Sequence, residues 1–120
     1  IIKGWNTVST SYIDIYGNIV VSGANFSDII FGSMYNSPTK GNWGGIRLYS
    51  GSQSDISGAT FEYADTAISY NGSPINLSSV KFNENNLGIS ADAASASYPI
   101  NVSDITFTGN AATTSPSELW

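Results

Sequence analysis

The feature that most constrains the fold of this chain is a sequence repeat that occurs four times in one frame. Counted back from a phenylalanine, apolar residues recur at positions minus seven, minus five and minus two, with Ser54 as the one exception, and a serine stands at minus four in every copy. Successive phenylalanines are 35, 21 and 25 residues apart, a range typical of solenoid proteins. The phenylalanines are Phe26, Phe61, Phe82 and Phe107, and the serines are Ser22, Ser57, Ser78 and Ser103.

The repeat predicts two short strands joined by a corner. Positions minus seven and minus five face one side of a strand, and minus two and zero face one side of the next strand. Small residues stand between the two pairs, as a bend requires. A third strand is expected seven residues after the phenylalanine, at Ile68 and Ile89, with Ile46 as the equivalent in the first copy. Asn85 and Asn110 are expected at tight corners, because asparagine tolerates left-handed backbone geometry.

One such turn of chain cannot bury its apolar face alone, whereas stacked turns share a core. Short strands without helical periodicity therefore predict an all-β β-solenoid of about four to five coils. The four phenylalanines are expected to form a ladder inside it, and the four serines a second ladder at a corner.

The segments Gly41-Asn42-Trp43-Gly44-Gly45-Ile46 and Ser54-x-Ile56-Ser57-Gly58-Ala59, followed by Ala67-Ile68, carry a resemblance to a known family. They resemble the pectate-lyase-like repeats of right-handed parallel β-helix proteins, which are secreted or displayed on cell surfaces. The resemblance covers residues 13–110 and implies the fold and its handedness. It does not imply one activity, because the family includes lyases, glycosidases, esterases and adhesins.

The repeat also divides the chain. Residues 1–12 are expected to form an initial strand or cap, and residues 13–110 the β-helix domain. Residues 32–42 are an insertion within this domain that explains the long first spacing. Residues 111–120 are rich in small residues and are expected to be a linker-like tail.

Composition excludes several classes of function. The net charge is −5 and charged residues make up only 11% of the chain, so no basic stripe is present for nucleic acid. No apolar run is long enough to span a membrane. An uncharged polar surface favours an extracellular or cell-surface protein, and the absence of cysteine means only that the core must hold without disulfides. The chain is expected to be a mature or excised fragment of a longer secreted polypeptide. The glycosylation motifs at Asn25, Asn71, Asn76 and Asn101 fit this location, although about as many would arise by chance.

Recognisable catalytic sets are missing from the sequence. Without histidine or cysteine, the chain has no Ser-His or Cys-His nucleophile pair and none of the usual zinc ligand sets. The acidic pair, Gly-His-Gly and Arg-x-Lys of β-helix polygalacturonases are also absent. The one arginine, Arg47, could serve a lyase with Glu62 or Asp65 on the next coil. The favoured interpretation is a solvated strand residue paired with a carboxylate of a neighbouring coil.

A polar column is expected on the outside of the solenoid. Asp55, Asn76 and Asn101 share position minus six, so they should stack. Oxygen columns can hold calcium, but a hydrogen-bonded ladder or a simply solvated column is favoured, and no cofactor is expected.

The 32–42 insertion is the predicted recognition element. It brings Met34, Tyr35, Asn36, Lys40 and Trp43 to one edge of the solenoid. Arg47 is a further candidate binding residue. Aromatic faces stack on sugars, and binding residues favour loops on rigid scaffolds. The favoured alternative for Trp43 is that it anchors the loop.

Together these features predict a non-catalytic extracellular structural or adhesive module of a surface protein or filament, with carbohydrate as the candidate ligand. The alternative is a fragment of a β-helix polysaccharide lyase or glycoside hydrolase. Expected partners are neighbouring copies or adjacent domains, which would dock on the open strand edges at the coil ends, and polysaccharide.

Overall fold

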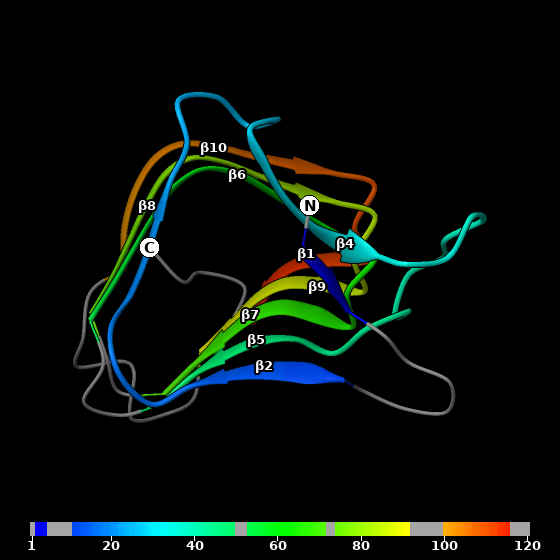
Figure 1. The fold of residues 1–120 in the computed structure, drawn as a ribbon, viewed down its shortest axis with the longest axis horizontal. Coiled ribbons are helices and arrows are strands. Elements are labelled where there is room, and N and C mark those ends of the chain that lie inside the picture. The colour runs from blue at the N-terminus through cyan, green and yellow to red at the C-terminus, as the bar shows by residue number, and fades with distance from the viewer. Residues whose placement is uncertain (1, 5–10, 50–52, 72–73, 92–99, 116–120) are drawn as a thin grey trace.

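A computed structural model describes residues 2–4, 11–49, 53–71, 74–91 and 100–115 (Figure 1). The described residues form eleven strands and no helix, in two sheets that we call sheet 1 and sheet 2. Sheet 1 contains β1 (Ile2–Gly4), β3 (Ile19–Ser22), β4 (Ile29–Ser33), β6 (Ser54–Glu62), β8 (Ile75–Asn83) and β10 (Ile100–Thr108). Sheet 2 contains β2 (Tyr12–Ile15), β5 (Gly45–Leu48), β7 (Thr66–Tyr70), β9 (Leu87–Ala91) and β11 (Ala112–Ser115).

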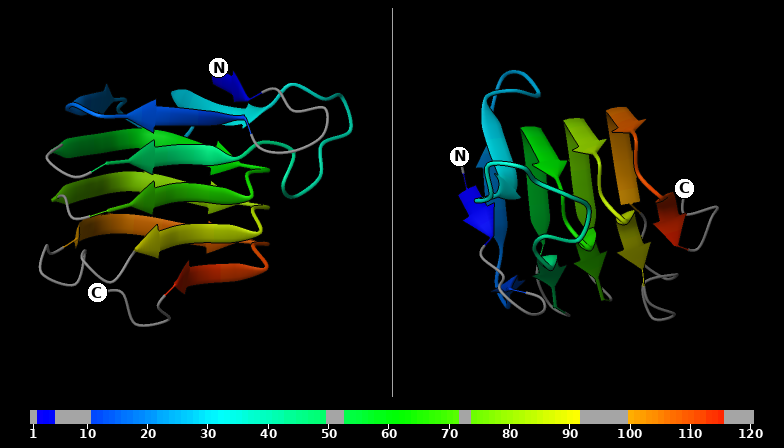
Figure 2. Two further views of the ribbon diagram at one scale, coloured as in Figure 1. Left: turned by 90° about the horizontal axis from the view of Figure 1, so that it is seen from below. Right: turned by 90° about the vertical axis from the view of Figure 1, so that its right-hand side faces the viewer.

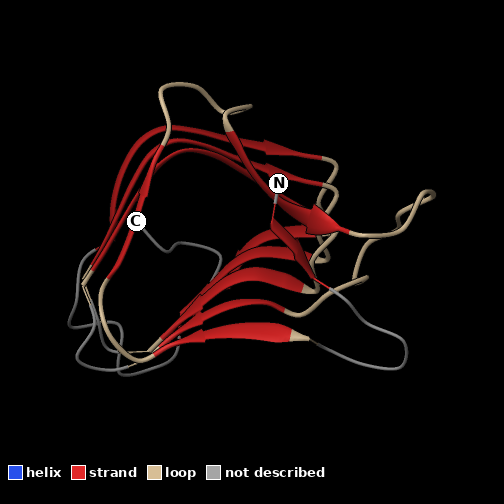
Figure 3. Ribbon diagram, viewed as in Figure 1, coloured by secondary structure: helices blue, strands red, loops and turns tan. Residues whose placement is uncertain are grey.

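Every strand pairs in parallel with its neighbours. The order is β1-β4-β6-β8-β10 in sheet 1, where β3 also pairs with β6, and β11-β9-β7-β5-β2 in sheet 2. From β4 onward the chain alternates between the sheets, and the strands stack in chain order along one axis (Figure 2). Figure 3 shows that the tan connections lie at the corners between the strand layers. The all-β class is confirmed, and the parallel stacking is compatible with the predicted β-solenoid.

The register confirms the repeat frame for the second to fourth copies. On β6, β8 and β10, residues at the same repeat position are direct partners, as for Phe61 and Phe82 or Ile75 and Ile100. In sheet 2, Ile46 pairs with Ile68 and Ile68 pairs with Ile89, as the third-strand prediction requires. These side chains are buried between the sheets and form one continuous apolar core.

The phenylalanine ladder differs from the prediction in its first member. Phe61, Phe82 and Phe107 stack with ring centroids 5.6 and 5.0 Å apart. The fourth ring belongs to Phe31, whose centroid lies 4.7 Å from that of Phe61. The prediction for Phe26 was therefore wrong.

An extra turn between β3 and β4 explains this difference. The Asp28 carboxylate accepts hydrogen bonds from the backbone N–H groups of Ala24 and Asn25 at 2.7 and 3.1 Å. This closes residues 23–28 into a loop, so the second half of the first repeat begins later in the chain. The carbonyl of Phe26 accepts a hydrogen bond from the Thr60 hydroxyl at 2.7 Å.

The left-handed corner residues are also not the predicted ones. Positive φ angles occur at Tyr63 (59°), Glu84 (54°) and Gly109 (67°), which share one repeat position. Asn85 and Asn110 each follow one of these residues. Both asparagines lie at the corner as predicted, but they do not have the left-handed backbone. Their side chains instead form hydrogen bonds with the backbone of the preceding coil.

The two ends of the chain contribute strands. Within the predicted cap, β1 pairs with β4, and β2 begins at Tyr12. Within the predicted tail, β11 pairs with β9, so residues 112–115 are part of sheet 2 and not a linker. Residues 5–10 and 116–120 lie outside the described residues. No helix long and apolar enough to cross a membrane occurs in the described part of the chain.

Candidate functional site

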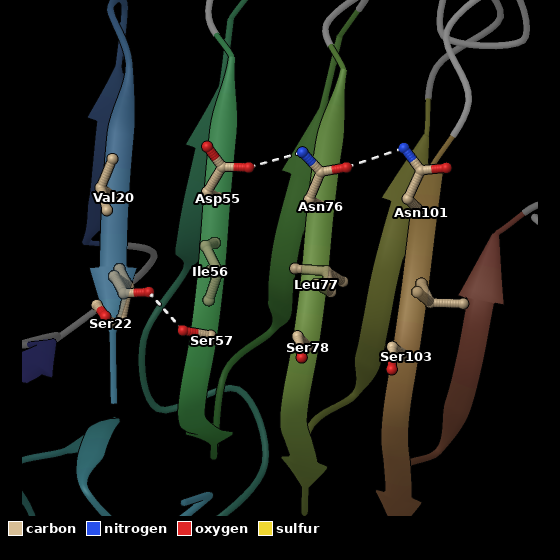
Figure 4. Close-up of a pocket in the computed structure, with 12 residues that line it drawn as sticks. Val20, Ser22, Asp55, Ile56, Ser57, Asn76, Leu77, Ser78, Asn101 and Ser103 are labelled. Atoms are coloured by element: carbon tan, nitrogen blue, oxygen red, sulfur yellow. Dashed lines mark hydrogen bonds between the residues drawn. The ribbon is translucent and has the colours of Figure 1, made fainter. Parts of the chain in front are cut away.

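A groove of about 430 Å³ crosses four parallel strands on sheet 1 (Figure 4). We call it the ladder groove. Ile56 and Leu77, which belong to the core, lie between two columns of polar side chains that run from strand to strand. Its lining is Val20, Val21 and Ser22 on β3, Asp55, Ile56 and Ser57 on β6, Asn76, Leu77 and Ser78 on β8, and Asn101, Val102 and Ser103 on β10.

One column of the ladder groove is the predicted minus-six set. The Asn101 side-chain amide donates to Asn76 Oδ1 at 2.8 Å, and the Asn76 amide donates to Asp55 Oδ1 at 2.6 Å. Of the two favoured alternatives, the hydrogen-bonded ladder is therefore the one that the structure shows. On β3 the paired residue is Val20, so the polar column ends at Asp55. Two of the predicted glycosylation acceptors, Asn76 and Asn101, use their side-chain amides here.

The other column is the predicted serine ladder. Ser22, Ser57, Ser78 and Ser103 are direct register partners across β3, β6, β8 and β10. The Ser57 hydroxyl donates to the carbonyl of Val21 at 3.3 Å. The other three serines are exposed. The groove thus presents hydroxyl groups along one side and amide groups along the other.

The ladder groove holds one carboxylate among its described lining residues. It belongs to Asp55, which accepts a hydrogen bond from Asn76. Glycoside hydrolysis requires a pair of carboxyl groups on either side of the sugar. Among the described residues, no group of three or more His, Cys, Asp or Glu side chains could hold a metal ion.

The predicted recognition loop lies between β4 and β5, and its residues do not form one surface. Tyr35 and Asn36 are exposed. Lys40 forms an ion pair with Glu84, with Nζ 2.5 Å from Oε2. Trp43 is only 1% exposed, and its indole N–H donates to the carbonyl of Glu62 at 2.8 Å. The assignment of Trp43 as a binding residue was therefore wrong, and its predicted alternative role as the loop anchor is confirmed.

Arg47 lies on β5 and is held by a residue of β2, the strand that pairs with β5 in sheet 2. Its Nε and Nη2 donate to the two carboxylate oxygens of Asp14 on β2 at 2.5 and 2.8 Å. The predicted pairing of Arg47 with a carboxylate of a neighbouring coil is therefore confirmed, and the carboxylate is that of Asp14. The Asp14 carboxyl accepts these hydrogen bonds, which hold its pKa below the ordinary value, and the pKa of Arg47 is raised by the same contact.

Three tyrosines around Arg47 were missed from the sequence. The guanidinium carbon of Arg47 lies 3.8 Å above the ring centroid of Tyr12 and 5.9 Å from that of Tyr49. Tyr16 and Tyr49 stack with their centroids 4.4 Å apart and their planes at 11°. The available signal was the alternation of Tyr12, Asp14 and Tyr16, which places all three on one face of a strand.

Comparisons with family models, curated proteins and solved structures give no match for this chain. The resemblance to β-helix repeats therefore stays a prediction.

Proposed function

We propose that the chain is a right-handed parallel β-helix and a non-catalytic, extracellular structural or adhesive module that binds polysaccharide along the ladder groove. The parallel pairing in both sheets and the alternation of the chain between them support the fold. The handedness rests on the general rule that crossover connections between parallel strands are right-handed.

The single observation that carries the binding proposal is the pair of polar columns in the ladder groove. Neighbouring strands are spaced by about 4.8 Å, so the columns offer hydrogen-bonding groups at a regular interval along the stacking axis. A linear polysaccharide offers hydroxyl groups at regular intervals too, and it can lie along this axis. Donors and acceptors are both present, because the serines carry hydroxyls and the amides of Asn76 and Asn101 carry both functions.

The charge of the lining favours a neutral polysaccharide. Among the described lining residues, Asp55 is the only charged side chain, and none of them is a cation that would attract a uronic acid polymer. The same lining argues against the lyase or hydrolase alternative, because its described residues include no second carboxylate and no arginine.

Affinity electrophoresis in gels that contain xylan, galactan or polygalacturonate tests the proposal. Retardation is expected in a neutral polymer and is expected to be lost in Ser78→Trp, whose ring would fill the groove. Ser27→Trp places the same side chain on an exposed loop away from the groove and should bind like the parent chain. Equal migration of the parent chain and Ser78→Trp in every gel would refute the ladder groove as the binding site.

A parallel assay addresses the enzyme alternative. The parent chain and Asp55→Asn are incubated with the polymers that retard migration, and new reducing ends and unsaturated products are measured. No product is expected from either protein. Product that forms with the parent chain and disappears with Asp55→Asn would replace the module proposal with a catalytic one.

A further inference from the structure

The ladder groove has a regular spacing in two directions. Along the stacking axis, the residues of each column are direct register partners on neighbouring strands, which lie about 4.8 Å apart. Along each strand, the two columns stand two residues apart, which is about 6.6 Å. On β6, β8 and β10, each strand therefore offers one carboxylate or amide and one serine hydroxyl at the same two positions.

The floor of the ladder groove between the two columns is backbone. Ile56 and Leu77 stand between the columns on β6 and β8, and their side chains are only 1% and 2% exposed (Figure 4). Successive side chains of a strand point to opposite faces, so the members of both columns point outward while Ile56 and Leu77 point into the core. A flat ligand can therefore lie on this floor with its two edges toward the two columns.

We propose that the ladder groove binds an extended, β-1,4-linked chain of pyranose rings with one sugar on each strand, a proposal that rests on the function proposed above. Where both linking oxygens are equatorial, the chain enters and leaves each ring on opposite sides. The polymer is then a nearly straight ribbon that advances by about one ring per sugar, close to the strand spacing of about 4.8 Å. Its hydroxyl groups lie along both edges, where they would meet the serine column on one side and the amide column on the other.

Other linear polymers do not stay in phase with the strands. An α-1,4 linkage leaves one ring through an axial bond, and a β-1,3 linkage joins positions that are not opposite each other on the ring. Both chains curve, so only one or two of their sugars could reach a straight row of strands at a time. An extended peptide repeats about every 3.3 Å, or about every 6.6 Å for side chains on one face, and neither interval matches the strand spacing.

The amide column ends at β6, which limits the number of sugars held on both edges. Asp55, Asn76 and Asn101 form this column on β6, β8 and β10, whereas Val20 takes the same register position on β3. Val20 is 72% exposed, so a sugar on β3 would meet the Ser22 hydroxyl but no amide. We therefore expect affinity to rise with each sugar up to three and to change little from three to four.

Titration of the whole chain with soluble oligosaccharides tests the linkage. The ¹⁵N-labelled protein is titrated with β-1,4-linked oligomers of glucose, mannose and xylose from one to six sugars long, and with α-1,4- and β-1,3-linked oligomers of glucose, each up to about 10 mM, the range of weak affinities. We expect saturable shifts at the amides of Ser57, Ser78 and Ser103 with at least one β-1,4 series. In that series the affinity should rise about threefold to tenfold with each sugar up to three, because each sugar adds hydrogen bonds.

Two results would overturn the linkage assignment. One is the absence of shifts at these amides with all three β-1,4 series. The other is an α-1,4 or β-1,3 hexaose that binds as tightly as the best β-1,4 hexaose, because a curved chain cannot place one sugar on each strand.

Variants at the two ends of the amide column test the correspondence of one sugar to one strand. Val20→Asn extends the column onto β3 and should raise the affinity for the tetraose about threefold or more relative to the triose. Val20→Ala is the matched control, which adds no amide and should leave this ratio as in the parent chain. An unchanged ratio in folded Val20→Asn would contradict the proposal.

Asn101→Val tests the same point from the other end and serves also if Val20→Asn proves unfolded by circular dichroism. It removes the amide on β10, so the triose should lose most of its advantage over the disaccharide. An undiminished advantage in Asn101→Val would contradict the proposal.

Failure of the linkage assignment can be told apart from failure of the proposed function. Gel retardation that Ser78→Trp abolishes, without a preference for β-1,4 oligomers, would keep the ladder groove as a polysaccharide site and overturn only the linkage. The absence of both retardation and shifts would overturn both proposals.

Discussion

The side chain of Asn85 is buried at the corner after β8 and is joined to Asn110 of the next coil, with Asn85 Nδ2 2.9 Å from Asn110 Oδ1. Asn85 also serves the preceding coil. Its Oδ1 accepts the backbone N–H of Ala64 at 2.8 Å, and its Nδ2 donates to the carbonyl of Phe61 at 3.0 Å. One amide thus satisfies buried backbone groups on one coil while it bonds to the next.

Replacement of Asn85 by alanine should therefore be strongly destabilising. The substitution leaves the Ala64 N–H and the Phe61 carbonyl without this partner inside the protein, and we expect a loss of about 2–4 kcal/mol in the free energy of unfolding. Urea denaturation monitored by tryptophan fluorescence measures this loss, because Trp43 is buried in the folded chain. Asn86→Ala is the matched control, because Asn86 is exposed and its side chain bonds only Asp65. A loss at Asn85 no larger than the loss at Asn86 would disprove the structural role.

Ser54 should be a site where a substitution stabilises the protein. Its hydroxyl is fully buried at the repeat position that carries isoleucine on β3, β8 and β10, and it is the one buried side-chain polar atom without a hydrogen-bond partner among the described residues. Ser54→Ala should raise the unfolding free energy by about 1 kcal/mol. Ser57→Ala should not, because the Ser57 hydroxyl has a partner. Thermal unfolding midpoints of the two variants and the parent chain are compared. A midpoint for Ser54→Ala below that of the parent chain would indicate that the Ser54 hydroxyl has an unrecognised hydrogen-bond partner.

Position 58 requires glycine because the backbone of Gly23, just after the neighbouring strand β3, approaches it closely, and not because its φ angle is positive. Gly58, Ser79 and Asp104 share one repeat position and all have positive φ, at 63°, 51° and 55°. Side chains are therefore tolerated at this corner in two coils. A Cβ on Gly58, however, would lie 2.1 Å from the carbonyl carbon of Gly23.

From this difference we expect Gly58→Ala to cost about 3 kcal/mol or more, at the upper end for single substitutions. Ser79→Gly should change stability by less than about 1 kcal/mol, since relief of the left-handed strain offsets the lost hydrogen bond to Asp104. Chemical denaturation measures the unfolding free energy of both variants. Similar losses of free energy in the two would show that the positive φ angle, and not the close approach to Gly23, makes glycine necessary at position 58.

The Asp14 carboxyl should titrate below its ordinary pKa of 3.8, because Arg47 hydrogen-bonds its charged form. A lowered pKa in the folded state means that the unfolded chain binds the proton more readily, so this contribution to stability is present above pH 3.8 and is lost as the pH falls through the folded value. Carbon-detected NMR of the carboxyl group follows the titration. In Arg47→Met the pKa should return toward 3.8; an unchanged pKa in that variant would exclude the ion pair as the cause.

The strand pattern was predictable because the repeat encodes it locally. The alternation around Ile75 and Leu77 and the recurrence of Ile68 and Ile89 fixed which residues pair and which are buried. The misplacement of Phe26 has a physical cause. The first copy contains both Phe26 and Phe31 in an apolar context, and only the closure of the loop by Asp28 decides which ring enters the core.

The candidate sites were less accessible from the sequence. The column of Asp55, Asn76 and Asn101 was found, because its members share a repeat position. The tyrosines around Arg47 were not found, because Tyr12, Tyr16 and Tyr49 fall outside the recurring apolar frame and come together only where β2 pairs with β5. A periodic sequence predicts the contacts of residues that recur in every repeat, but it does not predict a surface that is built from residues present in one repeat only.

The loop at residues 23–28 has a wider consequence. It lengthens one corner, yet β3 and β4 still pair with the two halves of β6 in the same register as β8 does. Added chain is thus absorbed outside the stack and leaves the strand spacing unchanged. Such a corner is suited to the insertion of a foreign peptide. The inserted peptide would be displayed at a fixed position along the stacking axis, and the register of the strands on either side would be unchanged.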